Sequence, residues 1–456
     1  MNTKIKFGTD GFRGIIGKNF TYEAVRKITV AIAEYLRSGT IIIGYDPRKD
    51  ADKFARQSAE ILAEFGFEVL LSEKVVPTPV IAYATRNIIS AGAIMFTASH
   101  NPPEYLGIKF IPNYGGPATS DITREIEHLI EDKICTLEKN EGSIKKYDFS
   151  QIYFDGIDKL IDFEVIKNNQ PKVIYDGLFS ASIGYFDKIL RNKGIEFEIY
   201  NDYYDSNFGG FLPEPKKEFM QHSKVGYITL ANDGDADRYG VIDEEGNYVS
   251  PNLIMAILLK YLKEKGMNGS VIKTVGVSQI VDVVAEKLAV PVVETAVGFK
   301  YIGEKMREIE TILGGEDSGG LSTGNHISEK DGIYANLLIM EMLAKTNKTL
   351  NQLVNEIVDF AGVEFVQDRI DVKLDSDDKK DEIIYRISNE ESFAVQNIVK
   401  RTEIDGVKLY LEDGVTKILI RKSGTEPLLR FYIETNSNSK LQSIKEFIKG
   451  YMFIVK

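Results

Sequence analysis

The amino-acid sequence predicts a multidomain α/β protein that ends in a smaller α+β domain. The chain has 456 residues and 43% hydrophobic content, so it can bury several cores, and its length suggests roughly three or four domains. Strand-like and helix-like patterns alternate along most of the chain, which is typical of largely parallel sheets. After about residue 365 the pattern changes to successive strands and a final helix, which indicates the α+β domain.

The first α/β unit follows a glycine-rich opening, FGTDGFRG, at residues 7–14. Apolar residues at helical spacing and β-branched runs bounded by turn residues define its elements. The expected elements are a helix at 22–37, a strand at 40–44, a helix near 52–65 and strands at 67–71 and 91–96.

Two further units repeat the strand–turn–helix–strand order over about 25–30 residues, although residue identity between the units is slight. A charged segment at 138–150 is the expected linker between the first and second units. The second unit should contain a strand at 172–175, a helix near 181–193 and a strand at 195–200; the third should contain a strand at 270–275, a helix near 278–288 and a strand at 290–294. The last domain should contain strands at 406–411 and 416–420 and a helix near 438–450.

Composition narrows the classes of partner and compartment. The net charge of -12, with no long basic run, argues against a nucleic-acid partner. The only cysteine, Cys135, rules out an intrachain disulfide framework and fits a reducing compartment. The N-terminus lacks an apolar signal core, and the longest apolar stretch, 253–259, is too short to span a bilayer. We therefore expect a cytoplasmic protein without a membrane or nucleic-acid partner.

A hydroxyl is expected at the end of the strand at 91–96. The segment TASHNPP follows, and its prolines prevent the chain from continuing as helix or strand. Open α/β sheets bind ligands just outside the carboxyl ends of their strands, which makes Ser99 a candidate nucleophile. A simple turn cap is an equally open interpretation of this segment.

Three carboxylates occupy every second position in DGDADR, at Asp233, Asp235 and Asp237. In an extended chain the outer two would be too far apart to share an ion, but Gly234 and Ala236 let the segment curl until all three converge. Such a cluster of hard oxygen ligands indicates a divalent cation.

Other interpretations of this acidic segment are weaker. The aspartates and Glu244 fit the first, third, fifth and twelfth positions of a calcium-binding helix-loop-helix, but its sixth position requires glycine and here is Arg238. An aspartyl-phosphate phosphatase motif needs Thr or Val where this chain has Asp237. A solvated acidic turn that binds no ion remains as an alternative.

Three further segments carry candidate binding groups. GGEDSGG at 314–320 offers hydrogen-bond acceptors and a hydroxyl suited to sugar hydroxyls. HISEKDG at 326–332 gathers titratable groups that could transfer protons, although surface charge clusters of this kind are usually just solvated. RKSGTEP at 421–427, followed by Arg430, begins where a strand should end. Its guanidinium groups, hydroxyls and backbone N–H groups could form a phosphate cradle, with a polar hairpin loop as the alternative.

Taken together, these segments resemble the α-D-phosphohexomutase superfamily, the phosphoglucomutases and phosphomannomutases. The resemblance covers essentially the whole chain, because five motifs occur in the order of the family: FGTDGFRG, TASHNP, DGDADR, GEDSG and RKSGTEP. It implies three related α/β domains with mixed sheets and a C-terminal α+β domain around a central cleft. The expected boundaries are 1–148 for the domain with the phosphoserine loop, 149–252 for the metal-binding loop, 253–366 for the sugar-binding loop and 367–456 for the phosphate-binding loop.

The resemblance also implies roles for single residues. Ser99 would be carried as a phosphoserine and, with Asp233, Asp235 and Asp237, would hold one Mg²⁺ per chain. Glu316 and Ser318 would contact the sugar, with Gly298 as a further substrate-binding candidate. The phosphate would be bound by Arg421, Ser423, Gly424, Thr425 and Arg430. The catalytic candidates are Arg13, His100, Lys109, Lys330 and His326, of which Lys109, Lys330 and His326 are candidates for proton transfer, and Arg238 is a further electrostatic partner.

Elementary electrostatics agrees with a bound cation. A phosphoserine carries nearly two negative charges. Beside three aspartates, each pair of unit charges at 4 Å would cost about 4 kcal/mol at an effective dielectric constant of 20. A divalent cation would neutralise this cluster and withdraw charge from the phosphoryl group.

The expected activity is the interconversion of hexose 1-phosphate and hexose 6-phosphate through a hexose 1,6-bisphosphate. Many phosphomannomutases and phosphoglucosamine mutases resemble one another in having His after the Ser-Gly of the sugar loop, where this chain has Gly320. This departure favours glucose phosphate, then mannose phosphate, and leaves glucosamine and pentose phosphates open. A plain phosphohydrolase and a non-catalytic phosphosugar-binding protein are alternatives from other classes, and the protein could be a monomer or a homodimer.

Overall fold

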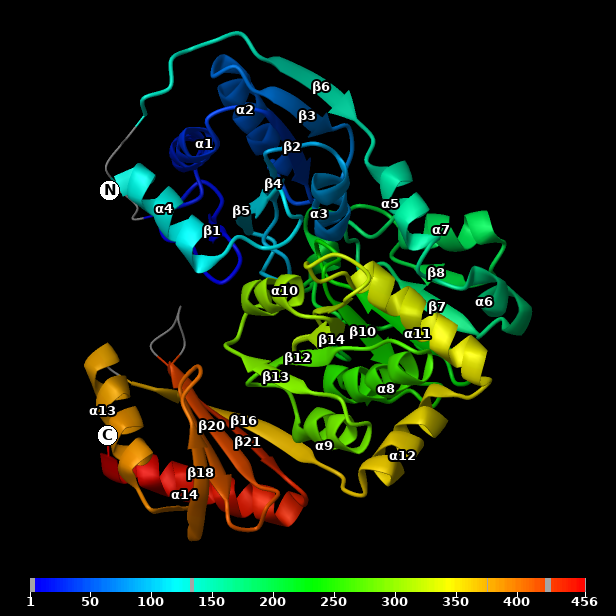
Figure 1. The fold of residues 1–456 in the computed structure, drawn as a ribbon, viewed down its shortest axis with the longest axis vertical. Helices are drawn as coiled ribbons and strands as arrows, with labels where there is room; N and C mark the ends of the chain where they lie inside the picture. The colour runs from blue at the N-terminus through cyan, green and yellow to red at the C-terminus, as the bar shows by residue number, and fades with distance from the viewer. Residues whose placement is uncertain (1–4, 132–134, 375, 423–427, 456) are drawn as a thin grey trace.

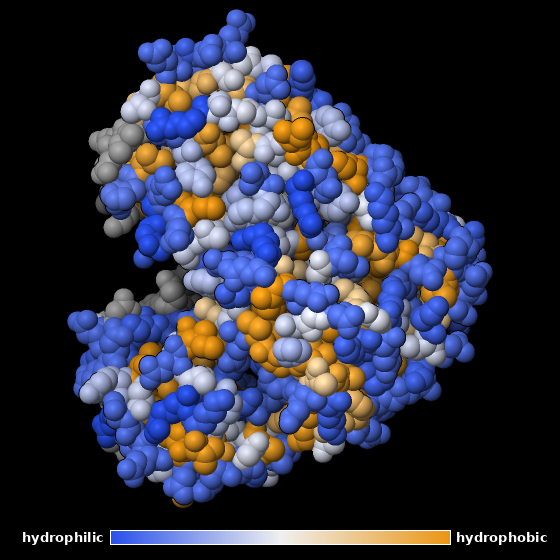
Figure 2. Space-filling model, viewed as in Figure 1, coloured by the Kyte–Doolittle hydropathy of each residue, from blue (hydrophilic) through white to orange (hydrophobic). Residues whose placement is uncertain are grey.

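The computed structural model of the chain describes residues 5–131, 135–374, 376–422 and 428–455. Four sheets are arranged along an open arc, with the N-terminal and C-terminal sheets at its two ends (Figure 1). Figure 2 shows the molecule hollowed between these two ends. The mixed α/β architecture predicted from the sequence is confirmed. No helix in the described ranges is both long and apolar enough to cross a membrane.

The first sheet has six strands in the order β1-β5-β4-β2-β3-β6 and is mixed, because β5 runs antiparallel to β1 and β4. Its strands are β1 (Phe12–Ile15), β2 (Thr40–Tyr45), β3 (Glu68–Ser72), β4 (Gly92–Phe96), β5 (Tyr105–Pro112) and β6 (Ser143–Tyr147), and its helices are α1 (Tyr22–Leu36), α2 (Ala51–Glu64), α3 (Thr78–Asn87) and α4 (Ser120–Glu131). Alternate side chains of β2 enter different cores: Ile41 and Ile43 pack with α1 and α2, whereas Ile42 packs with α3. Both faces of this sheet are therefore covered.

Two smaller mixed sheets form the middle of the arc. The second sheet comprises β7 (Val173–Asp176), β8 (Glu198–Tyr200), β9 (Ile228–Asn232), β10 (Tyr239–Ile242) and β11 (Tyr248–Val249), with α5 (Ser150–Ile157), α6 (Phe163–Asn169), α7 (Phe186–Lys193) and the 3-10 turn η1 (Phe208–Gly210). The third comprises β12 (Ser270–Thr274), β13 (Val292–Thr295), β14 (Thr311–Gly315) and β15 (Leu321–Thr323), with α8 (Pro251–Glu264), α9 (Gln279–Lys287), α10 (Phe299–Glu308), α11 (Gly332–Thr346) and α12 (Leu350–Ala361). Helix α11 is buried along almost its whole length, because it packs against β9 and β10 of one sheet and β15 of the other. It therefore joins the two sheets into one core.

The C-terminal sheet is antiparallel throughout, with strand order β16-β21-β20-β19-β18-β17. Its elements are β16 (Val366–Lys373), α13 (Asp377–Asn389), β17 (Ser392–Phe393), β18 (Gln396–Thr402), β19 (Val407–Leu411), β20 (Lys417–Lys422), β21 (Leu428–Thr435) and α14 (Asn438–Val455). A separate apolar cluster lies between this sheet and α14. The expected domain boundaries remain our proposal, and they assign one sheet to each domain except that β16 starts at Val366, one residue earlier.

Three local predictions differ from the structure. The expected linker at 138–150 contains β6, an edge strand whose exposed, charged side chains hide any alternation. The helix expected from residue 181 begins only at Phe186, because the preceding turn packs under the acidic loop, with the Ala181 N–H bonded to the Gly234 carbonyl at 3.0 Å. The strand expected from residue 195 covers only Glu198–Tyr200.

Candidate active site

Ser99 lies in the loop between β4 and β5, just past the carboxyl end of β4. Its backbone is in the left-handed region, with φ of 51°, and its N–H donates to Thr97 Oγ1 at 2.8 Å. The Ser99 hydroxyl donates to Asp233 Oδ2 at 2.6 Å, and the residue is only 1% exposed. The structure thus brings the predicted nucleophile into direct contact with the predicted acidic cluster.

The acidic loop connects β9 to β10 and curls as the sequence predicted. One carboxylate oxygen from each of Asp233, Asp235 and Asp237 lies within 4.8 Å of the others, and all three residues are buried. Ala236 makes the bend with φ of 60°. Gly234 makes the close approach, because a Cβ at this position would lie 2.5 Å from the carbonyl oxygen of Ser99.

The acidic triad fits a divalent cation. Asp235 Oδ1 and Asp237 Oδ1 are buried without a hydrogen-bond partner, which leaves two hard oxygen ligands available to a cation. Burial, followed by the charges of Asp237 and Asp235, raises the pKa of Asp233 well above its ordinary value. A cation bound by the triad would remove both the unsatisfied oxygens and the mutual repulsion.

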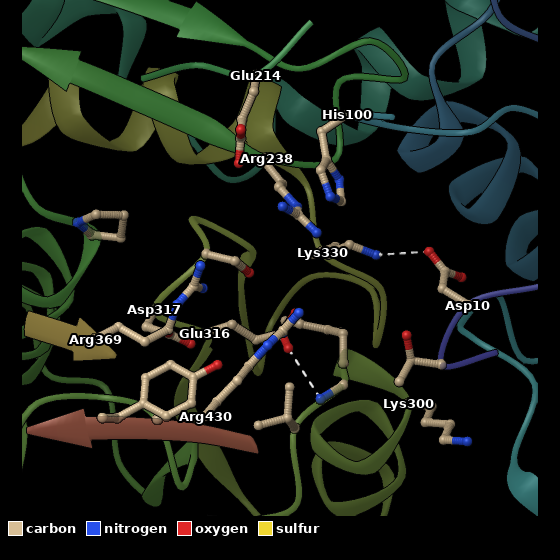
Figure 3. A pocket seen from close by; sticks show the side chains of 18 of the residues that line it. Asp10, His100, Glu214, Arg238, Lys300, Glu316, Asp317, Lys330, Arg369 and Arg430 are labelled. Atoms are coloured by element: carbon tan, nitrogen blue, oxygen red, sulfur yellow. Dashed lines mark hydrogen bonds and ion pairs between the residues drawn. The ribbon is translucent and has the colours of Figure 1, made fainter. Parts of the chain in front are cut away.

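Two lysines connect the triad to Asp10 of the N-terminal motif. Lys109 Nζ lies 2.7 Å from Asp10 Oδ2, 2.9 Å from Asp235 Oδ2 and 3.0 Å from Asp237 Oδ2. Lys330 Nζ lies 2.9 Å from Asp237 Oδ2 and 3.3 Å from Asp10 Oδ2, a contact drawn in Figure 3. Burial alone would raise the pKa of Asp10, but the attraction of Lys109 and Lys330 outweighs it and lowers the pKa. Asp10 was not singled out from the sequence, although the motif FGTDGFRG contains it.

A cavity of about 410 Å³ opens beside this cluster and is lined by segments from all four domains. The predicted residues that line it are Arg13, His100, Arg238, Gly298, Glu316, Ser318, Lys330, Arg421 and Arg430, and the lining residues missed from the sequence include Asp10, Glu214, Lys216, Lys300, Asp317 and Arg369. Figure 3 shows Arg369 and Arg430 on the side of the cavity opposite His100. The expected central cleft is therefore present, and both acidic and basic side chains line it.

The sugar-loop candidates lie at one wall of this cavity. Glu316 Oε1 accepts the backbone N–H of Gly298 at 3.1 Å, which links the loop after β14 to the start of α10. Burial raises the pKa of Glu316 to about 7. An isolated antiparallel β-bridge between the backbones of Arg238 and Gly320 connects this wall to the acidic loop.

Arginines from three adjacent strands of the C-terminal sheet face the same cavity. Arg421 on β20 and Arg430 on β21 are register partners, and Arg369 lies on β16, the next strand. Arg421 Nη2 lies 2.9 Å from Asp405 Oδ2, and the same oxygen accepts the backbone N–H of Val297 at 3.1 Å. Asp405 thus connects Arg421 in the cavity wall to the loop between β13 and α10, which contains Val297. The predicted phosphate-binding residues Ser423, Gly424 and Thr425 lie outside the described residues.

The remaining catalytic candidates separate into two groups. His100 lies in the cavity wall with Nδ1 3.3 Å from Ser99 Oγ, and the positive charge of Arg238, followed by burial, lowers its pKa well below the ordinary value. His326 is not a cavity residue: its Nε2 lies 2.8 Å from Asp331 Oδ2, and its ring stacks on Tyr83. Asp331 caps α11, so this histidine belongs to the packing around that helix.

Comparison with known proteins assigns the family. Models of the phosphoglucomutase/phosphomannomutase alpha/beta/alpha domains I, II and III match residues 4–135, 151–246 and 250–360, and the model of the C-terminal domain matches residues 370–450. A phosphoglucomutase/phosphomannomutase of Thermococcus kodakarensis is 29% identical, and a phosphoglucosamine mutase of Methanocaldococcus jannaschii is 31% identical, each over 96% of both chains.

A solved structure from Thermus thermophilus, provisionally assigned as a phosphomannomutase, superposes with a TM-score of 0.86 at 30% identity. The superposition covers 99% of this chain and 100% of that chain. Because the four domain models match in order along nearly the whole sequence, the chain belongs to the phosphoglucomutase/phosphomannomutase family and is a phosphohexomutase, an isomerase of the intramolecular phosphotransferase class.

Proposed function

We propose that this chain interconverts the 1-phosphate and 6-phosphate of a hexose, with glucosamine phosphate as the leading substrate and Ser99 as the phosphoryl carrier. The observation that carries this proposal is the hydrogen bond from Ser99 Oγ to Asp233 Oδ2, 2.6 Å long, beside the charged cavity. A binding protein would require neither a buried hydroxyl nor an acidic triad at this position.

The serine is suited to carry the phosphoryl group. In the first half-reaction a free hydroxyl of the sugar monophosphate attacks the phosphorus of the phosphoserine, and the bond from phosphorus to Ser99 Oγ breaks. The product is a hexose 1,6-bisphosphate. In the second half-reaction Ser99 Oγ attacks the other phosphate of the turned intermediate, so no phosphate is lost to water.

The residues around Ser99 divide the remaining tasks. Asp233, Asp235 and Asp237 would hold one Mg²⁺, which when bound supplies positive charge near the phosphoryl oxygens. Of the three residues predicted for proton transfer, Lys330 lines the cavity and stays our candidate.

Binding of the second phosphate is assigned to the C-terminal sheet. Arg369, Arg421 and Arg430 are presented by adjacent strands across the cavity from the acidic triad's side, and guanidinium groups match phosphate oxygens in pairs. A phosphate held there would place the sugar in the cavity that His100, the neighbour of Ser99, helps to line. The same arginines would accept either phosphate of the bisphosphate after it turns.

Two observations support glucosamine phosphate ahead of glucose and mannose phosphates, which the sequence alone had favoured. Phosphoglucosamine mutases of Methanocaldococcus jannaschii and Clostridium botulinum are each 31% identical over 96% of both chains. The cavity also presents the carboxylates of Glu214, Glu316 and Asp317, which could accept hydrogen bonds from a sugar ammonium group. The relative named phosphoglucomutase/phosphomannomutase keeps glucose and mannose phosphates as the second candidates.

A substrate comparison tests this proposal. The purified protein is given Mg²⁺, a trace of hexose 1,6-bisphosphate and, in turn, the 1-phosphates of glucosamine, glucose, mannose and ribose, and the 6-phosphate or 5-phosphate product is followed by phosphorus NMR. We expect the highest kcat/KM for glucosamine 1-phosphate and no release of inorganic phosphate. A tenfold preference for another sugar would overturn the substrate assignment, and release of inorganic phosphate without isomerisation would indicate a phosphohydrolase.

A further inference from the structure

Arg48 is a buried arginine that the proposed chemistry does not use. It lies between β2 and α2, in the turn DPRKD, and is only 3% exposed. Its Nε donates to Asp46 Oδ2 at 3.1 Å, and its backbone N–H donates to Asp46 Oδ1 at 3.0 Å. It does not line the substrate cavity. A buried charge of this kind is costly unless the protein satisfies every donor.

The other four N–H groups of the guanidinium donate to backbone carbonyl oxygens of the segment 99–105, the serine loop. Nη2 donates to the carbonyl oxygens of Ser99, at 2.6 Å, and Asn101, at 2.7 Å. Nη1 donates to the carbonyl oxygens of Pro102, at 2.7 Å, and Tyr105, at 3.0 Å. All five donors of Arg48 are therefore engaged, and four of them hold the backbone that carries the candidate nucleophile.

The serine loop needs such an external support. Ser99 is in the left-handed region, which is unfavourable for a residue with a side chain. Pro102 and Pro103 have no N–H with which to build hydrogen bonds inside the loop. A lysine could not replace the arginine, because one ammonium with three donors cannot span four carbonyl groups.

Arg48 also connects the serine loop to the second sheet, whose β9–β10 loop bears the acidic triad. Its guanidinium carbon lies 4.9 Å from the ring centroid of Phe208, in the connection between β8 and β9. Gly234 of the acidic loop also approaches the Ser99 carbonyl oxygen so closely that a Cβ there would lie 2.5 Å away. The Ser99 carbonyl oxygen thus lies close to both Arg48 and the acidic loop.

We propose that Arg48 is a positioning residue for phosphoryl transfer: it fixes the Ser99 backbone so that Oγ stays in contact with Asp233. The inference rests on the proposed role of Ser99 as the phosphoryl carrier. Arg48 acts on the transfer to and from Ser99 and not on sugar binding, because it contacts the loop backbone and no residue of the arginine set.

The test compares Arg48→Lys and Arg48→Ala with the wild-type protein and with Arg86→Lys as a matched control. Arg86 also donates to a backbone carbonyl, that of His326 at 2.5 Å, but outside the serine loop. Steady-state constants are measured with the preferred sugar phosphate. The rate at which hexose 1,6-bisphosphate phosphorylates the unphosphorylated protein is followed separately by intact-protein mass measurement.

We expect both Arg48 variants to lose at least 30-fold in kcat and in the phosphorylation rate, with KM changed less than threefold, and Arg86→Lys to stay within threefold of wild type. Added guanidinium or methylguanidinium ions should restore at least fivefold of the rate of Arg48→Ala, whereas urea of the same concentration should not. Because the Arg48 variants could fail to fold, Phe208→Leu provides a second variant, with an expected three- to tenfold loss of kcat at unchanged KM.

The two proposals fail in different ways. If wild-type protein is never phosphorylated on Ser99, the proposed carrier role is wrong. If wild type is phosphorylated there but folded Arg48 variants keep the wild-type phosphorylation rate, or lose activity only through KM, the positioning role is wrong. If the Arg48 variants do not fold, an unchanged kcat for Phe208→Leu overturns the positioning role.

Discussion

Replacing Gly234 by alanine should separate the two loops on which the proposed transfer depends. The new Cβ would lie 2.5 Å from the Ser99 carbonyl oxygen, and real Cβ atoms keep at least 3.0 Å from such neighbours. The backbone on one side must therefore shift by at least about 0.5 Å, since close-packed atoms leave no room for overlap. Gly234 does not have a positive φ, so the substitution introduces this contact without left-handed strain.

The magnitude follows from the sensitivity of transfer reactions to alignment. A misplacement of about 1 Å can cost about 100-fold, so a shift of half that size should lower kcat by about 10-fold or more, which is about 1.4 kcal/mol in the barrier. The contact from Ser99 Oγ to Asp233 Oδ2, now 2.6 Å, would lengthen beyond a good hydrogen bond. KM should change less than twofold, because the arginines of the C-terminal sheet are untouched.

The assay is the mutase reaction at saturating Mg²⁺ and bisphosphate, combined with thermal unfolding to confirm that the variant folds. Gly450→Ala is the matched control, because nothing lies within 4 Å of the Cβ it would add, and its helical position favours alanine. A folded Gly234→Ala protein with a wild-type kcat would refute the reasoning that this close approach aligns the serine with the triad.

Three further outcomes are expected. Burial raises the pKa of Glu316 from 4.5 to about 7, so the free energy of unfolding should fall as pH rises through this window. Glu316→Gln should therefore be more stable than wild type at pH 8, by up to about 3 kcal/mol, and should lose this advantage at pH 4. Urea unfolding at the two pH values measures the difference. Asp237→Asn should weaken Mg²⁺ activation at least tenfold in a metal titration, because it removes one charged ligand; an unchanged titration would exclude Asp237 from the metal site. Asp405→Asn should raise KM about three- to tenfold at nearly constant kcat, because Arg421 loses the carboxylate that orients it; a fall in kcat alone would contradict this role.

Sequence reasoning succeeded where the signal was local. The curl of the acidic loop followed from small residues between the aspartates, and the structure forms it with Ala236 at positive φ. The position of Ser99 at a strand end followed from a buried apolar run that stops at prolines. Both features depend on a few adjacent residues, so the pattern contains the information.

Sequence reasoning failed where the outcome depended on residues far apart in the chain. His326 was a candidate for proton transfer, but its ring stacks on Tyr83, which is distant in the sequence, and it does not line the cavity. The role of Asp10 becomes visible only when Lys109 and Lys330 converge on it. No periodicity or spacing records such contacts, because they join elements that are far apart in the sequence.

Transfer of a phosphoryl group through the hydroxyl of Ser99 is the central claim, and a pulse-chase mass measurement tests it most directly. Unphosphorylated protein is mixed with Mg²⁺ and one equivalent of hexose 1,6-bisphosphate. One sample is then fragmented for mass measurement, and a parallel sample is chased with hexose monophosphate before it is fragmented. The account predicts one phosphate on Ser99 after the pulse and its transfer to the sugar during the chase, at a rate no slower than kcat. Full mutase turnover with no phosphate on Ser99, or with phosphate on Ser99 that the chase leaves in place, would contradict it.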